Sequence, residues 1–257
     1  PIFCPLCGGT NFECHGIGTQ KVAEELQRLF PDANVLRMDT DTTSGKDGHE
    51  KILSSFASGE AAFLVGTQMI AKGHDFPNVT LVGIISADSL INMPDYKAEE
   101  RAFQLFTQMA GRAGRGSSAG KVIIQAYHTD DYAITAACTH NYEEFYKNEI
   151  AVRRNLNYPP FSAMCILRFS GENDKETYQT AASACAKMRE TGVTAVEILG
   201  PARAERPKLN NRYRWLITLK GRRREEIIAF LAYWTDHGKM LKKIRGRTKL
   251  SIRFDGR

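Results

Sequence analysis

The chain has 257 residues, of which 42% are hydrophobic and 25% are charged, as in globular proteins with one large domain or two small ones. No apolar run reaches the roughly 18 residues of a membrane span and no signal peptide is recognisable, which argues against a membrane association and favours the cytoplasm. The net charge of +6 is concentrated late in the chain, since residues 201–257 hold 17 Lys and Arg against 5 Asp and Glu, and this favours a polyanion or an acidic peptide as partner over a merely solvated basic tail.

Hydrophobic periodicity predicts alternating helices and strands in the first 130 residues. The expected helices are 19–30, 48–59 and 98–111, and the expected strands are 35–39, 61–67, 79–88 and 121–127. The last two strands are continuous apolar runs, which is typical of strands buried on both faces. The alternation therefore predicts an α/β lobe whose parallel sheet is covered by helices on both sides.

A long helical stretch is expected from about residue 130 to 156, ending before the consecutive prolines of Tyr158-Pro159-Pro160-Phe161. Because two prolines in succession cannot continue a helix, we expect a domain boundary there. Beyond it the expected order is strand 164–170, helix 174–191, strands 196–205 and 212–220, helix 224–239 and strand 248–254. This β-α-β-β-α-β order predicts an α+β domain of the split βαβ, ferredoxin-like type over residues 158–257.

The strongest motif is Gln108-Met-Ala-Gly-Arg112-Ala-Gly-Arg115, at the end of the third expected helix. Its arginines are three residues apart, and its glycines let the backbone turn sharply against another surface. A guanidinium pairs phosphate oxygens bidentately, and an arginine supplied to a nucleotide can raise its hydrolysis about 10³–10⁵-fold. The motif predicts part of a nucleotide-hydrolysing site, with a basic, glycine-rich helix C-cap as the alternative.

A second motif, Gly66-Thr67-Gln68-Met-Ile-Ala-Lys72-Gly73-His74-Asp75-Phe76-Pro77, follows the expected strand 61–67. Ligand sites of parallel sheets lie at the carboxyl ends of their strands. Thr67 and free backbone N–H groups there are suited to a DNA phosphate, and Asp75 to a ribose hydroxyl or an arginine. The alternative is a plain strand-to-helix loop, but two motifs in this order are more specific than either alone.

No sequence fits the P-loop pattern that a complete NTP-hydrolysing helicase requires. The nearest match, Gly116 to Val122, is one residue short, ends in Val122 where a hydroxyl is needed, and precedes an expected strand. We interpret Asp88, which ends an apolar strand like a Walker B aspartate, as structural or as a contact between lobes. The chain begins at Pro1, and we expect it to be part of a longer protein whose other lobe holds the nucleotide.

The cysteines suggest a partial zinc site. Cys4-Pro-Leu-Cys7 is a half-site for zinc, and the adjacent pair Cys14-His15 would complete it only with strain, so an unmetallated segment is the alternative. The remaining cysteines, Cys138, Cys165 and Cys185, lie in apolar or helical contexts and are expected to be buried thiols. None of them requires a disulfide, as is usual in the cytoplasm.

Arg212-Tyr213-Arg214-Trp215 begins an expected strand. Alternation places the two arginines on one face and the two aromatic residues on the other. We interpret Trp215 as a core residue and Arg212 and Arg214 as contacts for phosphates or for an acidic peptide, the alternative being arginines on a solvated face.

Three stretches resemble the PriA family of primosomal replication-restart helicases (primosomal protein N′). They are GIGTQKVAEELQRLFPDANVLRMDTDTT (16–43), ISADSLINMPDYKAEERAFQLFTQMAGRAGR (85–115) and LGPARAERPKLNNRYRWLITLKG (199–221). The resemblance implies a superfamily 2, 3′→5′ DNA helicase that uses ATP with Mg²⁺, binds stalled forks and single strands, and restarts replication with other primosome proteins. It implies a RecA-like second lobe over 17–157 and a C-terminal domain of ribosomal S10-type fold, which binds DNA and the acidic tail of single-strand-binding protein.

The resemblance also implies roles for individual residues. Arg112 and Arg115 would be arginine fingers supported by Gln108, and Gly73 and Asp75 would border the nucleotide. The DNA backbone would be contacted by Gly18, Thr19, Gln20, Gly66, Thr67, Gln68 and Lys72. Cys4 and Cys7 would be the last of four cysteine pairs that hold two zinc ions in the full-length protein, so residues 1–16 would be the remnant of a zinc-binding insertion.

Two other readings remain open at this point. In one, the chain is a non-catalytic nucleic-acid-binding module whose arginines contact only phosphates. In the other, it belongs to a different superfamily 2 helicase, such as a RecG-like one, which would share the arginine motif without the C-terminal domain.

Overall fold

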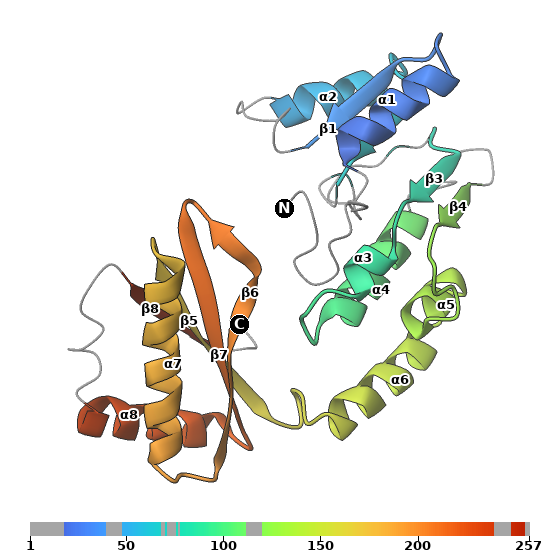
Figure 1. The fold of residues 1–257 in the computed structure, drawn as a ribbon. Helices are drawn as coiled ribbons and strands as arrows, with labels where there is room; N and C mark the ends of the chain where they lie inside the picture. The colour runs from blue at the N-terminus through green and yellow to red at the C-terminus, as the bar shows by residue number, and fades with distance from the viewer. Residues whose placement is uncertain are drawn as a thin grey trace, which may run out of the picture. The chain divides into compact units, whose positions relative to one another are not determined.

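The computed structural model describes residues 18–39, 48–67, 70, 76, 78–111, 120–238 and 248–254 (Figure 1). The chain forms two compact units, Pro1–Lys147 and Asn148–Arg257. This division falls ten residues before the boundary expected from the proline pair. No helix within the described ranges combines the length and the apolar character needed to cross a bilayer.

The first unit contains short elements in the alternating order that the periodicity predicts. They are α1 (Thr19–Leu29), β1 (Val35–Met38), α2 (Gly48–Ala57), β2 (Phe63–Gly66), β3 (Leu81–Ile84), α3 (Asp88–Ile91), α4 (Ala98–Ala110), β4 (Lys121–Ile124) and α5 (Tyr132–Cys138). Parallel pairing joins β1 to β2 and β3 to β4. The α/β character is therefore confirmed, whereas the short helix α3 was not expected.

The expectation of one parallel sheet with strands buried on both faces is wrong for the described residues, where β1–β2 and β3–β4 form separate two-stranded sheets. Val82 and Ile84 of β3 are buried against side chains of α4 and α5. Leu81, whose side chain points to the other face of the strand, is 56% exposed. Only one face of β3–β4 is covered by described elements. An apolar run alone did not distinguish this half-covered strand from a fully buried one.

The single long helix expected from residue 130 to 156 is also wrong, because α5 ends at Cys138 and a second helix, α6, spans Tyr142–Asn155. His140 has a positive φ of 51° between them. The Asn141 side chain accepts a hydrogen bond from the Glu144 backbone N–H and donates one to the Glu144 carboxylate. This reciprocal arrangement resembles a capping box and starts a new helix.

The second unit begins within α6 and contains β5 (Ala163–Gly171), α7 (Asp174–Glu190), β6 (Val196–Leu209), β7 (Arg212–Gly221), α8 (Arg224–Gly238) and β8 (Lys249–Phe254). The predicted β-α-β-β-α-β order is confirmed. The four strands form one antiparallel sheet in the order β6-β7-β5-β8. Buried Lys220 fastens the end of α6 to this sheet, donating to the Leu156 carbonyl at 3.0 Å and lying 4.4 Å from the Tyr158 ring centre.

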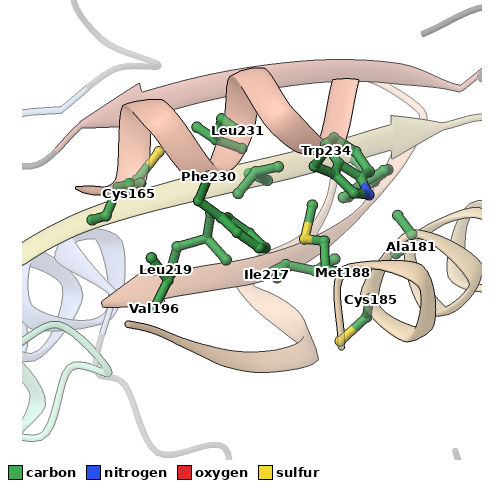
Figure 2. Close-up of a cluster of buried hydrophobic side chains, with 14 residues drawn as sticks. Cys165, Ala181, Cys185, Met188, Val196, Ile217, Leu219, Phe230, Leu231 and Trp234 are labelled. Carbon is green, nitrogen blue, oxygen red and sulfur yellow. The ribbon is translucent and has the colours of Figure 1, made fainter. Parts of the chain in front are cut away.

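Helices α7 and α8 of the second unit cover the same face of the sheet. Figure 2 shows their side chains gathered over the strands, with Met188 of α7 and Trp234 of α8 near Ile217 of β7. The strand residues in this core share one face because the register pairs Cys165 with Leu219 and Leu167 with Ile217. Alternate residues of the same strands consequently point to the opposite face, which neither α7 nor α8 covers.

A two-residue turn links β6 to β7. Asn210 and Asn211 both have positive φ, at 50° and 57°, and the flanking Leu209 and Arg212 are paired. Two left-handed residues are the requirement of a type I′ hairpin, and Asn tolerates that conformation well. The turn allows β6 to continue to Leu209, four residues beyond the expected end.

Of the three cysteines expected to be buried, two are buried and one is exposed. Cys165 and Cys185 lie in the core of the second unit, and burial raises the pKa of Cys165 to about 11. Cys138 is exposed, so that expectation was wrong. Cys138 is the last residue of α5. The preceding Ala136 and Ala137 are buried in the core, and the Cys138 side chain lies at the surface.

Candidate functional site

Helix α4 leads into the arginine motif. Its buried residues Ala102, Phe103 and Phe106 form one stripe packed in the core of the first unit, and Phe106 is completely buried. Gln108 lies in the last turn and is exposed. The helix ends at its C-cap, Gly111. Arg112 and Arg115 lie outside the described residues, so the structure positions the helix that leads to them and not the guanidinium groups.

The strand ends of β1 and β2 form the edge from which the second motif starts. Met38 and Gly66 are partners at these two ends. A Cβ atom on Gly66 would lie only 2.5 Å from the Met38 carbonyl oxygen and would also meet Ile70. The glycine is thus required by the close approach of backbone and side chain. Thr67 follows it directly and is exposed.

The amino terminus of α1 is attached to the same edge. The Thr19 hydroxyl donates to the Asp39 carboxylate at 2.7 Å, and the Arg37 Nε lies 2.9 Å from the same carboxylate oxygen. Asp39 follows Met38 as Thr67 follows Gly66, so both residues are at the carboxyl ends of the paired strands. The structure therefore brings the beginning of α1, with Gly18 as its N-cap, to the edge that carries Gly66 and Thr67.

The remaining predicted site residues are Gln20 and a group that lies outside the described residues. Gln20 is exposed and donates to the Glu24 carboxylate in the next turn of α1. Those that lie outside the described residues are Cys4, Cys7, Gln68, Lys72, Gly73, Asp75, Arg112 and Arg115. Within the described part of the chain, no group of three or more His, Cys, Asp and Glu side chains is arranged to hold a metal ion.

Asp88 has the structural role expected of it. Its carboxylate accepts backbone N–H groups from Tyr127 at 2.9 Å and His128 at 3.2 Å. The hydrogen bond from Tyr127 is the main reason that the pKa of Asp88 is held below its usual range. The side chain thus ties the end of β3 to the residues after β4. Lys121 begins β4, which supports the rejection of the P-loop match.

Arg212 and Arg214 differ in their surroundings although they share one face of β7. Arg212 donates from Nε to the Ser170 hydroxyl at 3.0 Å and from Nη2 to the Ser170 carbonyl at 2.7 Å. Its Nη1 lies 3.6 Å from the Glu172 carboxylate. Arg214 is partly exposed and makes no hydrogen bond or ion pair with the described residues. Arg212 therefore fastens β7 to the end of β5, and Arg214 is available to a ligand.

Trp215 packs against the core but is only partly buried. Its indole Nε1 donates to Asp174 at 2.9 Å, and the Arg203 guanidinium lies 4.8 Å from its ring centre while also pairing with Asp174 at 2.8 Å. These contacts lower the pKa of Asp174, the Trp215 hydrogen bond first. Asp174, Arg203 and Trp215 are distant in the chain, so no local sequence pattern predicts this group of three.

Two family models match the chain in succession. The helicase conserved C-terminal domain matches residues 12–117, and the primosomal protein N C-terminal domain matches residues 154–257. The first covers the elements that carry both motifs, and the second covers the four-stranded sheet with its two helices.

Curated relatives match across both units. The chain is 43% identical to the replication restart protein PriA of Bacillus subtilis over 93% of its own length and 30% of the relative. It is 44% identical to PriA of Synechocystis over 86% of its length and 26% of the relative, and 35% identical to PriA of Haemophilus influenzae over 86% and 30%. The chain thus spans less than a third of the length of these relatives.

Proposed function

Because this chain belongs to the PriA family of replication restart proteins and corresponds to their C-terminal part, we propose that it supplies the second lobe and the C-terminal domain of an ATP-dependent DNA helicase. The whole protein would unwind DNA in the 3′→5′ direction at stalled forks and restart replication through primosome assembly. A cytoplasmic location agrees with that role.

The observation that carries this proposal is the succession of two domain matches in one chain. A helicase C-terminal domain alone fits many superfamily 2 enzymes, including RecG-like ones. The primosomal domain over residues 154–257 disfavours those alternatives. It also supports DNA and other primosome proteins as partners, and the acidic tail of single-strand-binding protein is a further proposed partner of this domain.

In the proposed site, Arg112 and Arg115 act as arginine fingers and Gln108 supports them. The exposed position of Gln108 at the end of α4 is compatible with a contact to another lobe. Fixed guanidinium groups stabilise charge that develops on a phosphoryl group as it is transferred. The P-loop and the Mg²⁺ ion bound with ATP would belong to that other lobe, and Gly73 and Asp75 would border the nucleotide.

The proposed DNA contacts are Gly18, Thr19, Gln20, Gly66, Thr67, Gln68 and Lys72. Support comes from the common edge of β1 and β2, where the Thr19–Asp39 hydrogen bond keeps the start of α1 beside Thr67. Backbone N–H groups at a helix start, here at the N-cap Gly18, are suited to phosphate oxygens. Asp39 in turn orients the Thr19 hydroxyl, whose oxygen can still accept a hydrogen bond.

Two finer assignments complete the proposal. The second unit is assigned a ferredoxin-like, S10-type fold, which the antiparallel order β6-β7-β5-β8 supports. Cys4 and Cys7 are assigned to a zinc site of the full-length protein, because two cysteines separated by two residues are half of a structural zinc site.

The test is Arg112→Ala in the complete gene product that contains this segment. We expect its DNA-stimulated ATPase to fall about 10³-fold or more while its DNA affinity stays within about twofold, since the arginine contacts the nucleotide. Arg101→Ala is the matched control, because this exposed arginine of α4 pairs, among the described residues, only with Asp95 at the surface.

Unchanged ATPase with weakened DNA binding would instead identify a non-catalytic nucleic-acid-binding module. The isolated chain of 257 residues should not hydrolyse ATP at a measurable rate. DNA-stimulated hydrolysis by this chain alone would contradict the division of the site between two lobes.

A further inference from the structure

The face of the second unit's sheet that α7 and α8 leave open carries a regular set of cations. In the register, Arg214, Ser170 and Lys249 form one row across β7, β5 and β8. The next row contains Leu216, Arg168 and Ser251, and the third contains Thr218, Ile166 and Arg253. Three of the corners and the centre of this nine-residue array are therefore positively charged. We call Arg168, Arg214, Lys249 and Arg253 the open-face cations.

These four side chains are not committed to the fold. Arg168, Lys249 and Arg253 are exposed and Arg214 is partly exposed. None of the four forms a hydrogen bond or ion pair with the described residues. Over the described lengths of β5, β7 and β8, the open face contains no Asp or Glu. Glu172 lies just beyond β5 beside Arg212, and Glu197 of β6 is paired in register with Lys220.

Other arginines of the unit show the opposite behaviour. Arg203 pairs with Asp174, Arg189 donates to the carbonyl oxygens of Ile198 and Gly200, and Arg212 donates to Ser170. Each of these has an acceptor within the fold. Four neighbouring cations without acceptors repel one another, a cost that a bound polyanion would remove.

The spacing suits a phosphate backbone. Adjacent strands lie about 4.8 Å apart and alternate residues of one strand about 6.8 Å apart. The open-face cations therefore span about 10 Å across the sheet and about 14 Å along it. Such an area can meet several phosphates, since a DNA duplex carries one charge per about 1.7 Å of axis.

The composition of the face argues against recognition of unpaired bases. Proteins that bind single strands combine positive charge with aromatic side chains on which bases stack. Here the aromatic residues of the same strands alternate onto the helix-covered face, and they are Phe169, Tyr213, Trp215 and Phe254. The strand residues of the open face include no aromatic side chain, and the Tyr158 ring at one end of the face is in contact with Lys220. The array of cations therefore gains from dense phosphate charge and offers no ring of its own for stacking bases.

We propose that the open face of the sheet, through Arg168, Arg214, Lys249 and Arg253, binds the sugar-phosphate backbone of double-stranded DNA without reading its sequence. This proposal rests on the proposed function, which names DNA as the ligand. It adds which surface binds the DNA, that the DNA is double-stranded, and that the contacts are to its backbone. In a helicase, this surface would hold the duplex arm while other residues act on the single strand.

The test compares two double variants of the whole chain that change the net charge equally. Arg168→Glu/Arg214→Glu alters the open face, and Lys175→Glu/Arg223→Glu alters exposed cations at the starts of α7 and α8. Binding to a fluorescent 20-base-pair duplex is measured by anisotropy between 50 and 200 mM salt. For the open-face variant we expect affinity at 100 mM salt to fall about tenfold or more and the log–log salt slope to shrink by about 1.8, or about 0.9 per lost phosphate contact.

Each remaining outcome is decisive. The control double variant should bind the duplex within about twofold of the unchanged chain. If both double variants lose affinity equally, the loss is due to net charge alone and the proposal is overturned. If the glutamates unfold the sheet, Arg168→Gln/Arg214→Gln should give the same change of slope with unchanged circular dichroism. Tighter binding of oligo-dT than of duplex through these residues, or stronger displacement by an acidic peptide than by DNA, would also overturn it.

Failure of the two proposals can be told apart. If the unchanged chain binds duplex DNA and the open-face variant binds it equally well, this inference alone is wrong. If the unchanged chain binds no DNA at all, both this inference and the proposed DNA contacts of the first unit are contradicted.

Discussion

The second unit buries its strands more extensively than the β1–β2 part of the first unit does. In the first, the described strands have four residues each, and the cluster around β1 and β2 has three buried members, Met38, Leu53 and Phe76. In the second, one sheet has strands of up to 14 residues, and its core includes completely buried residues from β5, β7, α7 and α8. The described parts of the two motifs lie at the end of β2 and at the end of α4 in the first unit, whereas the second unit presents its candidate ligand surface on a paired sheet.

This difference indicates where each unit tolerates change. The described ends of β1 and β2 can adjust to a partner lobe at low cost, because the cluster that supports them has three buried members. A sheet face keeps its side chains at fixed spacings because every strand is paired and packed from behind. A site completed by another lobe suits the first arrangement, and a fixed pattern of charges suits the second.

The largest effect should come from comparing one truncation in each core. Leu167→Ala in the second unit should reduce the free energy of unfolding by about 4 kcal/mol, because the residue is completely buried and its neighbours cannot collapse around the cavity. Leu53→Ala in the first should cost about 2–3 kcal/mol, since its small cluster can relax. Urea denaturation followed by circular dichroism measures both.

Tryptophan fluorescence separates the two units in the same experiment, because both tryptophans, Trp215 and Trp234, belong to the second unit. Leu167→Ala should shift the fluorescence midpoint and Leu53→Ala should leave it unchanged. A fluorescence shift of similar size in both variants would mean that the units unfold together and would weaken the contrast between them.

A smaller effect is expected from two glycines within the first unit. Gly66→Ala should destabilise by about 1–3 kcal/mol, because its new methyl group would meet the Met38 carbonyl and Ile70. Gly83→Ala in β3 is the control, with nothing within 4 Å of the added Cβ, and should be neutral or slightly stabilising. Thermal unfolding compares them, and equal stability of the two variants would contradict the close approach at the β1–β2 edge.

The smallest effect concerns acid stability, which an aspartate of lowered pKa in each unit can test. Asp88 is held by backbone N–H groups, and Asp174 by Trp215 and Arg203. A carboxyl group whose folded pKa is depressed stabilises the fold above its unfolded pKa of about 3.9, and this stability is lost as pH falls through the folded value. Asp88→Asn and Asp174→Asn should therefore lose less stability than the unchanged chain between about pH 4 and pH 2.

Urea midpoints at pH 7, 4 and 2.5 check this prediction. The fluorescence midpoint should respond to Asp174→Asn alone, and the dichroism of the first unit to Asp88→Asn. A steeper acid loss in either variant than in the unchanged chain would reverse the sign and refute the assigned hydrogen bonds as its cause.

The sequence predicted the second unit more accurately than the first because its periodic segments are longer. Most of its expected elements lie within two residues of the observed bounds, and the extension of β6 follows from the turn at Asn210-Asn211. In the first unit, a continuous apolar run suggested a strand buried on both faces, but Leu81 is exposed. The break between α5 and α6 could have been predicted from Asn141 and Glu144, whose spacing is that of a capping box.

The sequence by itself determined the order of the elements, the two motifs and the family, since these depend on local periodicity and on residues near one another in the chain. Only the tertiary structure decided which of two neighbouring arginines is available. Arg212 and Arg214 are equivalent by alternation, yet the Arg212 side chain donates to Ser170, 42 residues away, whereas the Arg214 side chain makes no hydrogen bond or ion pair with the described residues. The same pairing of distant strands gathers Arg168, Arg214, Lys249 and Arg253 onto one face, because register joins residues that no local pattern relates.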